Sequence, residues 1–482
     1  MAGGRDEAVA RARAGFDSGR YVAALTELVA VPSESQRADS EPELRRYCAD
    51  VFGPMVAGLG FDTKVLDNPI QGRGPVLLGT RIEDPALPTV LVYGHGDVVR
   101  GMPERWRTNL DPWRVSVEGE RIYGRGAADN KGQHLIALES LRAVIGTRGR
   151  LGFNATMLIE TGEEVGSPGL REFLRRHRNL CAADVFIGLD GPRKNTRIPE
   201  LSLGARGAVS FDLVVHLREG SHHSGHWGGV LADPGFILAH ALACIVTRTG
   251  RILVPGWLPA HVPESVRRAC AQVEFEDAPD LPEADPNWGE PGLGKAERIF
   301  TWTSVIVLAS ITGEPQAPMN AVAGSARARL QVRHTVDLDA DSIIPNLRAH
   351  LDANGFAQVR IVPVQDQERF PASRTDPDNE WVRLVVDSLT RTAGRAPNVV
   401  PNGAGSNPSE IFKQELGVPV MWVPQSYAGC GQHGPNEHAL APLCRDGLGL
   451  MAGIWWDIGE GGPARGGPHG PWPGAQSSGS GA

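Results

Sequence analysis

Three short blocks in the first third of the chain combine imidazole or carboxylate groups with glycine. His95 and Asp97 stand in Gly-His-Gly-Asp, and Asp129 follows Gly-Arg-Gly-Ala-Ala. Glu163 and Glu164 follow Glu-Thr-Gly. Imidazole and carboxylate groups are the ligands that hydrolytic divalent cations take in proteins. The three blocks together therefore predict a pair of metal ions that activates water for hydrolysis.

Elementary geometry indicates how these side chains could divide the work. Side chains two residues apart on a strand share a face, so Asp97 can orient His95 as a metal ligand. Asp129 stands where a glycine-rich turn opens a helix, which suits a ligand that bridges two ions. Glu163 and Glu164 are adjacent, so one can bind metal while the other takes a proton from the attacking water.

Two later residues complete the candidate ligand set. Asp190 ends an apolar run, and His433 lies in Cys-Gly-Gln-His-Gly. Each block has an ordinary explanation when taken alone: a local hydrogen bond, a helix cap, or a solvated acidic pair. Their joint occurrence at successive strand ends favours the metal site, because ligands collect at the carboxyl ends of parallel strands.

Alternating strands and helices are expected to position these groups. The apolar and β-branched runs that we expect to form strands are 76–80, 89–93, 154–160 and 184–189. The segments with helical spacing are 21–31, 42–59, 130–145 and 169–178. Strands that alternate with helices predict an α/β domain with a mostly parallel sheet.

The pattern changes after residue 193 and returns after residue 376. Residues in between predict an α+β unit, with alternating strands at 208–216 and 326–334, helices at 235–247 and 342–353, and a strand at 358–364. The stretch 250–296 is expected to be irregular or partly helical. Helices at 381–392 and 409–416 and a strand at 418–423 resume the α/β pattern. We therefore expect two domains, an α/β domain interrupted by an inserted α+β domain.

Length and composition exclude several classes of protein. A chain of 482 residues is longer than a single hydrophobic core usually serves, so two or more domains are expected. A net charge of −8 argues against nucleic acid as a partner. No apolar stretch approaches the roughly 18 residues of a membrane span, and residues 1–7 do not have the apolar core expected of a signal peptide. The six cysteines show no C-x-x-C spacing, so we expect reduced thiols and a cytoplasmic protein.

Further motifs identify a family that the chain resembles. Trp113 stands in Asp-Pro-Trp, Ile-Tyr-Gly-Arg-Gly occupies 122–126, and His-Ser-Gly-His-Trp-Gly-Gly occupies 223–229. With the blocks above, these resemble the M20 family of metallopeptidases from residue 21 to about 456, and most closely its carnosinase-like dipeptidases. The resemblance implies a catalytic domain (1–200 and 373–460) and an inserted lid and dimerisation domain (201–372). The Gly/Pro/Ser-rich composition of 461–482 predicts a disordered tail.

The resemblance also implies a role for each residue of the metal site. One divalent ion would be held by His95, Asp129 and Asp190, and the other by Asp129, Glu164 and His433. Zinc is the first expectation for both ions, and manganese or cobalt would fit the same ligands. Asp97 would orient His95, Glu163 would be the general base, and the Asp129–Asn130 peptide would be cis. His134, His216, His222, His226 and His438 are not expected to be ligands.

Four residues in or near the lid are implied to bind substrate. His223 would reach the active site of the partner protomer in a homodimer, and Arg333 would bind the substrate carboxylate. Gly405 and Ser406 belong to a Gly-Ser-Asn-Pro loop that would close on the substrate. The dipeptidases more often carry Ile in place of Asn407, and more often Glu-Gly-Glu-Glu-Glu at 160–164, and neither difference removes a ligand.

The expected reaction is hydrolysis of the amide bond in dipeptides or small peptide-like substrates. Two alternatives use the same metal ligands: removal of an N-acyl group from an amino acid, and aminohydrolysis of an aryl or amidine C–N bond. A catalytically silent binding protein on the same scaffold is disfavoured, because neither a ligand nor the base is missing.

Overall fold

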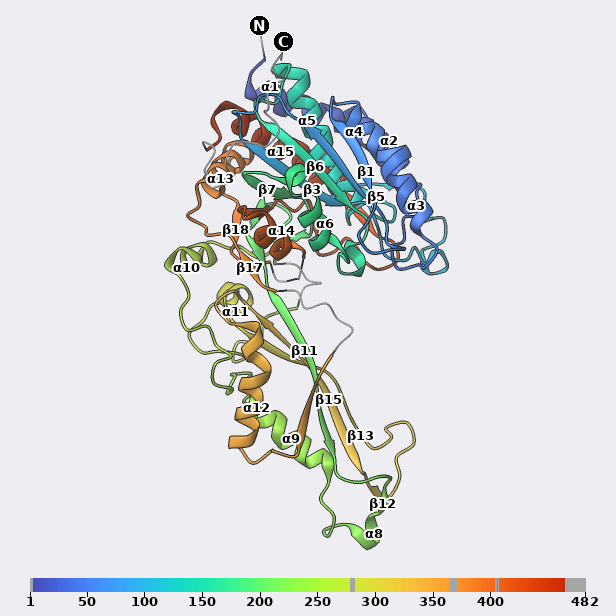
Figure 1. Ribbon diagram of the computed structural model, residues 1–482, viewed down its shortest axis with the longest axis vertical. Helices are drawn as coiled ribbons and strands as arrows, with labels where there is room; N and C mark the ends of the chain where they lie inside the picture. Colours follow the sequence, from blue (N-terminus) through green and yellow to red (C-terminus); the bar gives the residue numbers. More distant parts are fainter. Residues whose placement is uncertain (1–2, 278–281, 365–370, 404, 406, 464–482) are drawn as a thin grey trace, which may run out of the picture.

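The computed structural model describes residues 3–277, 282–364, 371–403, 405 and 407–463. Figure 1 shows a large sheet wrapped by helices, and a smaller sheet that projects from one side of it. The long strand β11 leads from the first part into the second. This arrangement confirms the mixed α/β fold with a second sheet in the middle of the chain.

The large sheet carries the ends of the strands that the sequence singled out. Its strands, in spatial order, are β1 (Asp62–Leu66), β2 (Val76–Arg81), β6 (Asn154–Glu160), β3 (Thr89–His95), β7 (Val185–Gly188), β19 (Val420–Trp422), β9 (Glu200–Ser202) and β18 (Asn398–Val400). The middle strands β6, β3, β7 and β19 run parallel. The edge pairs β1–β2 and β2–β6 and the pair β19–β9 are antiparallel, so the sheet is mostly but not wholly parallel.

Alternating side chains bury both faces of this sheet. On β3, Val90 and Val92 face one core, and Leu91 and Tyr93 face the other. The helices that pack in the first core are α1 (Arg5–Asp17), α2 (Arg20–Val29), α5 (Lys131–Arg148), α13 (Glu380–Ala393) and α15 (Ala441–Gly461). The helices in the second core are α6 (Leu170–Arg176) and α14 (Ser409–Leu416). Helical layers on both faces explain why these strands are almost wholly apolar.

The helix predicted at 42–59 forms in three pieces. α3 (Glu41–Arg46) continues into a π-helical segment, Tyr47–Phe52, and then into α4 (Gly53–Ala57). Both ends of the wider segment, Tyr47 and Phe52, are fully buried. A π-helical turn inside an α-helix is rare and often lies near a functional site.

The smaller sheet is antiparallel throughout. It consists of β13 (Ser304–Thr312), β15 (Ser325–His334), β11 (Gly207–His216) and β16 (Val359–Pro363), in that order. One face packs on α9 (Pro234–Ile245) and α12 (Ile343–Ala353), and it carries Phe211 and Leu330. The other face is polar: the carboxylate of Asp212 accepts hydrogen bonds from Arg327 and Arg329. The predicted alternation in β11 and β15 is therefore confirmed, whereas β13 was not predicted.

Shorter elements connect and flank the two sheets. They include β4 (Ser116–Glu118), β5 (Arg121–Tyr123), β8 (Pro192–Arg193), β10 (Gly204–Ala205), β12 (His222–His223), β14 (Ala321–Val322), β17 (Ser373–Arg374), β20 (Ser426–Tyr427), β21 (His438–Leu440), α7 (Arg178–Cys181), α8 (Ser224–Trp227), α10 (Glu264–Ala271) and α11 (Lys295–Phe300). The stretch 250–296 is thus partly helical, as expected. Among the described helices, none has the length and apolarity that crossing a membrane requires. All six cysteines are free thiols.

Candidate active site

The carboxyl ends of three parallel strands bring the candidate ligands together. His95 is the last residue of β3, and Asp190 follows β7 by two residues. β3 pairs with β7 on one side and with β6 on the other, where His95 lies opposite Glu160. Residues 163 and 164 begin a short 3-10 turn just after β6. The strand order therefore gathers groups that lie far apart in the sequence.

Two groups of donor atoms are each compact enough to hold a cation, and Asp129 belongs to both. His95, Asp129 and Asp190 form the first group, and Asp129, Glu164 and His433 form the second. His95 Nε2 lies 3.1 Å from Asp129 Oδ1, and His433 Nε2 lies 3.1 Å from Asp129 Oδ2. Each oxygen of Asp129 thus faces a different group, as a bridging ligand requires. The Asp129–Asn130 peptide is cis.

Asp97 links the first imidazole to the acidic turn. His95 Nδ1 lies 3.0 Å from the carbonyl oxygen of Asp97 and 3.4 Å from its Oδ1. The same carboxylate accepts hydrogen bonds from the backbone N–H groups of Glu163, at 3.2 Å, and Glu164, at 3.1 Å. A proton on Nδ1 would leave Nε2 free to bind metal, which is the orientation that an outer carboxylate gives a ligand.

A buried carboxylate that the sequence analysis missed holds the loop around Asp129. Glu437 accepts hydrogen bonds from the backbone N–H groups of Gly126, Ala128 and Asp129. Arg125 pairs with Glu437 at 2.8 Å, and both side chains are almost fully buried. The signal in the sequence was a carboxylate four residues after the predicted ligand His433.

Burial disfavours the ionised form of the acidic side chains in the site. Burial raises the pKa of Glu164 to about 7 and that of Asp190 to about 6, and neighbouring Asp129 adds to both shifts. Burial also raises the pKa of Glu163 well above its ordinary value. Burial opposes ionisation of Asp129 as well, but contacts with the histidines outweigh it and lower the pKa of Asp129.

These residues fit a pair of divalent cations. The donors are imidazole nitrogen and carboxylate oxygen only, the set that zinc, manganese and cobalt accept. Glu164 Oε1 is buried and has no hydrogen-bond partner among the described residues. Buried polar atoms are nearly always paired, so this oxygen indicates that a ligand belongs beside it.

The residues predicted to bind substrate lie elsewhere. Arg333 is partly buried in β15, and its carbonyl accepts a hydrogen bond from Arg206, whose backbone N–H donates to Gly403. These contacts connect Arg333 to the segment that precedes Gly405. His223 is exposed in β12, which Figure 1 shows at the far end of the smaller sheet. Ser406 lies outside the described residues.

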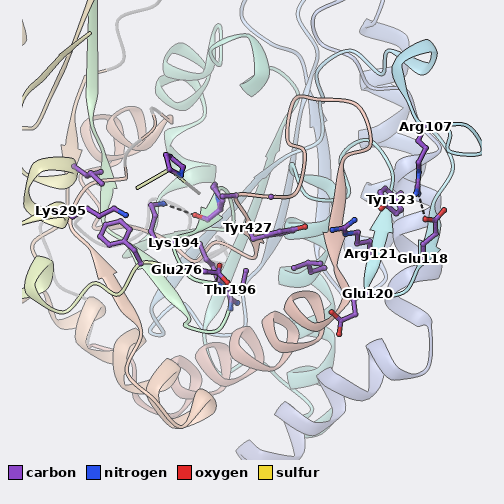
Figure 2. A pocket seen from close by; sticks show the side chains of 18 residues that line it. Arg107, Glu118, Glu120, Arg121, Tyr123, Lys194, Thr196, Glu276, Lys295 and Tyr427 are labelled. Atoms are coloured by element: carbon purple, nitrogen blue, oxygen red, sulfur yellow. Dashed lines mark hydrogen bonds and ion pairs between the residues drawn. The ribbon is translucent and has the colours of Figure 1, made fainter. Parts of the chain in front are cut away.

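A cavity of about 980 Å³ lies beside the strands β5, β8 and β20 (Figure 2). None of the proposed metal ligands is among the residues that line it. Several of its polar groups are paired with each other: Arg107 donates to Glu118 at 2.5 Å, and Thr196 donates to Glu276 at 2.7 Å. Among the described residues that line this cavity, no second group of converging metal donors comparable with the one around Asp129 is found.

The chain is similar to known dipeptidases. Human Beta-Ala-His dipeptidase is 25% identical over 470 residues, which cover 91% of this chain and 90% of that protein. The Cys-Gly metallodipeptidase dug1 of Schizosaccharomyces pombe is 30% identical over 438 residues, which cover 86% of this chain and 91% of that protein.

Solved structures share the fold. The di-peptidase Dug1p from Saccharomyces cerevisiae has a TM-score of 0.72 at 21% identity, over 94% of this chain and 99% of that chain. Human carnosine dipeptidase 1 has a TM-score of 0.72 at 22% identity, over 94% and 99% of the two chains. Residues 91–457 match the peptidase family M20/M25/M40. This segment contains both donor groups and most of the chain, and we conclude that the protein belongs to peptidase family M20/M25/M40.

Proposed function

We propose that the protein is a binuclear metal-dependent hydrolase that cleaves the amide bond of dipeptides or small peptide-like substrates. The observation that carries this proposal is the pair of donor groups that share Asp129. Relatives named as Beta-Ala-His and Cys-Gly dipeptidases support a dipeptide as the substrate.

The metal site and Glu163 would divide the chemistry between them. Two bound divalent ions, zinc in the first instance, would polarise the scissile carbonyl and lower the pKa of the attacking water. Glu163 Oε2 lies 4.0 Å from His95 Nε2, beside the first donor group. A carboxylate in this position could accept the proton of the attacking water and pass it to the leaving amine.

Arg333 and the loop at Gly405–Ser406 would hold the end of the substrate. A guanidinium presents two parallel N–H donors that match a carboxylate. Burial lowers the pKa of Arg333, but arginine remains charged throughout the neutral range. If Arg333 binds the substrate carboxylate, its distance from the metal ions would limit the length of the substrate.

We further propose a homodimer formed through the smaller sheet. β13 is an edge strand of that sheet, and it leaves Ile306, Val307 and Leu308 about half exposed. An exposed apolar edge strand is a template for pairing with another chain. We propose that this strand pairs with a second copy of the chain. β12, which carries His223, lies far from the metal-binding groups of its own chain (Figure 1), and a dimer could bring His223 to the active site of the partner.

Two finer assignments stay part of the proposal. The lid would comprise residues 201–372, and the strands of the smaller sheet fall within that range. A cytoplasmic location is compatible with six free thiols.

The nearest alternatives are removal of an N-acyl group from an amino acid and aminohydrolysis of an aryl or amidine C–N bond. All three reactions would use the same ligands, so the pocket and not the metal site selects among them. Metal-loaded enzyme assayed against dipeptides, N-acyl amino acids and amidines would separate them by kcat/KM.

Substitution Glu163→Gln tests the role of the general base. The amide keeps the shape of the side chain but cannot accept the proton, so we expect turnover to fall about 10²- to 10⁴-fold while two ions remain bound. Glu118→Gln, which alters an exposed carboxylate of the cavity wall, is the matched control and should retain activity. Full turnover in Glu163→Gln would remove Glu163 from the mechanism, and loss of both ions would show that Glu163 binds metal instead.

A further inference from the structure

Three buried polar side chains form a chain of hydrogen bonds behind the first donor group. Tyr47 lies in the π-helical segment, Asn130 precedes α5, and His134 lies in the first turn of α5. All three are fully buried. The Tyr47 hydroxyl lies 2.5 Å from His134 Nε2, and His134 Nδ1 lies 3.1 Å from Asn130 Oδ1. None of the three is a proposed ligand or the base.

Backbone groups on the far side determine how the amide of Asn130 is turned. Its Nδ2 donates to the carbonyl oxygen of Leu189 at 2.6 Å, and its Oδ1 accepts from the backbone N–H of His95 at 3.3 Å. Asn130 therefore joins the ends of β3 and β7, the two strands that supply His95 and Asp190.

The direction of each hydrogen bond follows from this orientation. Because Asn130 presents Oδ1 to His134, the imidazole must carry its proton on Nδ1 and donate it. Nε2 is then unprotonated and accepts a hydrogen bond from the Tyr47 hydroxyl. Burial lowers the pKa of His134 and raises that of Tyr47, so both groups remain neutral, as this arrangement requires.

Close packing leaves His134 little freedom to move. A Cβ atom at Gly94, the residue before His95, would lie 2.5 Å from His134 Cβ and 3.0 Å from Asn130 Oδ1. The ring of Phe52 meets that of His134 edge-on, with centroids 4.7 Å apart. The glycine thus lets His134 approach the strand that ends in a ligand, and the π-helical segment closes the other side.

We propose that Tyr47 and His134 are positioning residues that hold the amide of Asn130 and, through it, the His95–Asp190 side of the metal site. This inference rests on the proposed binuclear site. It adds that Tyr47 and His134 help determine how tightly one of the two ions is bound. Rotation of the amide would turn its oxygen toward the carbonyl oxygen of Leu189, and the two oxygens would repel each other. These contacts reach the backbone of His95 and of Leu189, the residue before Asp190, so they lie on the side of the first donor group.

Zinc affinity of the full chain, measured by competition with a chelator, tests the proposal. His134→Leu removes the donor to Asn130, and we expect one of the two zinc-binding steps to weaken about 10- to 100-fold, as for other residues that orient ligands. His134→Gln can donate to Asn130 and accept from Tyr47, and it should restore most of that affinity. Ser140→Ala is the control: Ser140 is buried in the same helix and accepts a hydrogen bond from Trp455, so it should cost stability without changing either zinc affinity.

A double-mutant cycle tests whether Tyr47 acts through His134. Tyr47→Phe should weaken the same zinc-binding step in the wild-type background and add nothing in the His134→Leu background. Equal losses in both backgrounds, or unchanged zinc affinities in His134→Leu, would overturn the relay while leaving the hydrolase proposal intact. Wild-type protein that takes up no pair of ions would overturn both.

Discussion

Two buried carboxyl groups near the site bind no cation in the proposed scheme, yet they shape it. Glu437 gathers the backbone N–H groups that precede Asp129, and Glu160 ends β6 opposite His95. Tyr93 and Ser167 donate hydrogen bonds to Glu160 Oε1 at 2.6 and 2.9 Å. Arg125 favours the ionised form of Glu437. Burial favours the neutral form of Glu160, although the two hydroxyl donors act in the opposite direction.

Removal of Glu437 should cost much more stability than removal of a surface carboxylate. Glu437→Ala leaves Arg125 buried without its ionic partner, and breaking such a pair costs about 3–5 kcal/mol. Glu118→Ala breaks the exposed pair with Arg107 and should cost about 0–1 kcal/mol. Urea unfolding of both variants checks this difference. Similar small losses would show that Arg125 finds another partner.

Glu160 should make stability depend on pH. Burial raises its pKa from 4.5 to about 7, so the folded chain holds a proton that the unfolded chain releases. Its contribution is therefore fully present below pH 4.5 and is lost as pH rises toward 7. With EDTA present, Glu160→Gln should gain up to about 3 kcal/mol over wild type between pH 5 and pH 8. Parallel curves for the two proteins would contradict the shift.

Sequence reasoning found the candidate ligands because their residue types and strand-end positions are themselves the signal. His95, Asp129 and His433 meet in space as expected. Glu437 and Asn130 were missed because they act on backbone groups of residues remote in the sequence, and neither residue type marks such a contact. Of His134 the sequence predicted only that it is not a ligand, whereas the structure shows it buried beside Gly94.

At the scale of elements, α15 shows why some of the fold escaped prediction. Its five glycines, Gly447, Gly449, Gly453, Gly459 and Gly461, lower helix propensity, and no helix was predicted over Ala441–Gly461. Four of them lie against neighbours that a side chain would meet: a Cβ atom at Gly449 would lie 2.6 Å from Arg13 Nε. Close tertiary contacts stabilise this helix, and a local sequence pattern does not reveal them. The helices α5 and α13 were predicted correctly.

Two glycines of α15 should respond oppositely to alanine. A Cβ atom at Gly459 would lie 2.1 Å from the carbonyl oxygen of Leu151, so Gly459→Ala should destabilise the fold by about 1–3 kcal/mol. Gly461 has no atom within 4 Å of that position, so Gly461→Ala should be neutral or stabilise by up to about 1 kcal/mol. The Tm of each variant, measured by thermal unfolding, distinguishes the cost of a steric clash from the gain in helix propensity. Equal shifts in Tm would mean that Leu151 moves aside.

For the whole molecule, the two sheets place the proposed site residues at different distances from the metal groups. Arg333 lies near the base of the smaller sheet, where β15 pairs with the start of β11. β12, which carries His223, lies at the opposite end (Figure 1). His223 Nδ1 accepts a hydrogen bond from Gly225 N, which leaves Nε2 to carry a proton that could be donated to an oxyanion. A complete site would then need residues from two chains.

Mixed dimers test this division of the site directly. Glu163→Gln and His223→Ala should each be nearly inactive alone, but in a mixed dimer one site combines an intact Glu163 with an intact His223 of the other chain. Random exchange of subunits in a symmetric dimer should then restore about a quarter of wild-type activity. Each variant taken alone through the exchange procedure shows whether activity is regained without mixing. Sedimentation measures whether dimers are present. If dimers form but the mixture stays inactive, His223 serves its own chain or none, and the second chain contributes only the contact along β13.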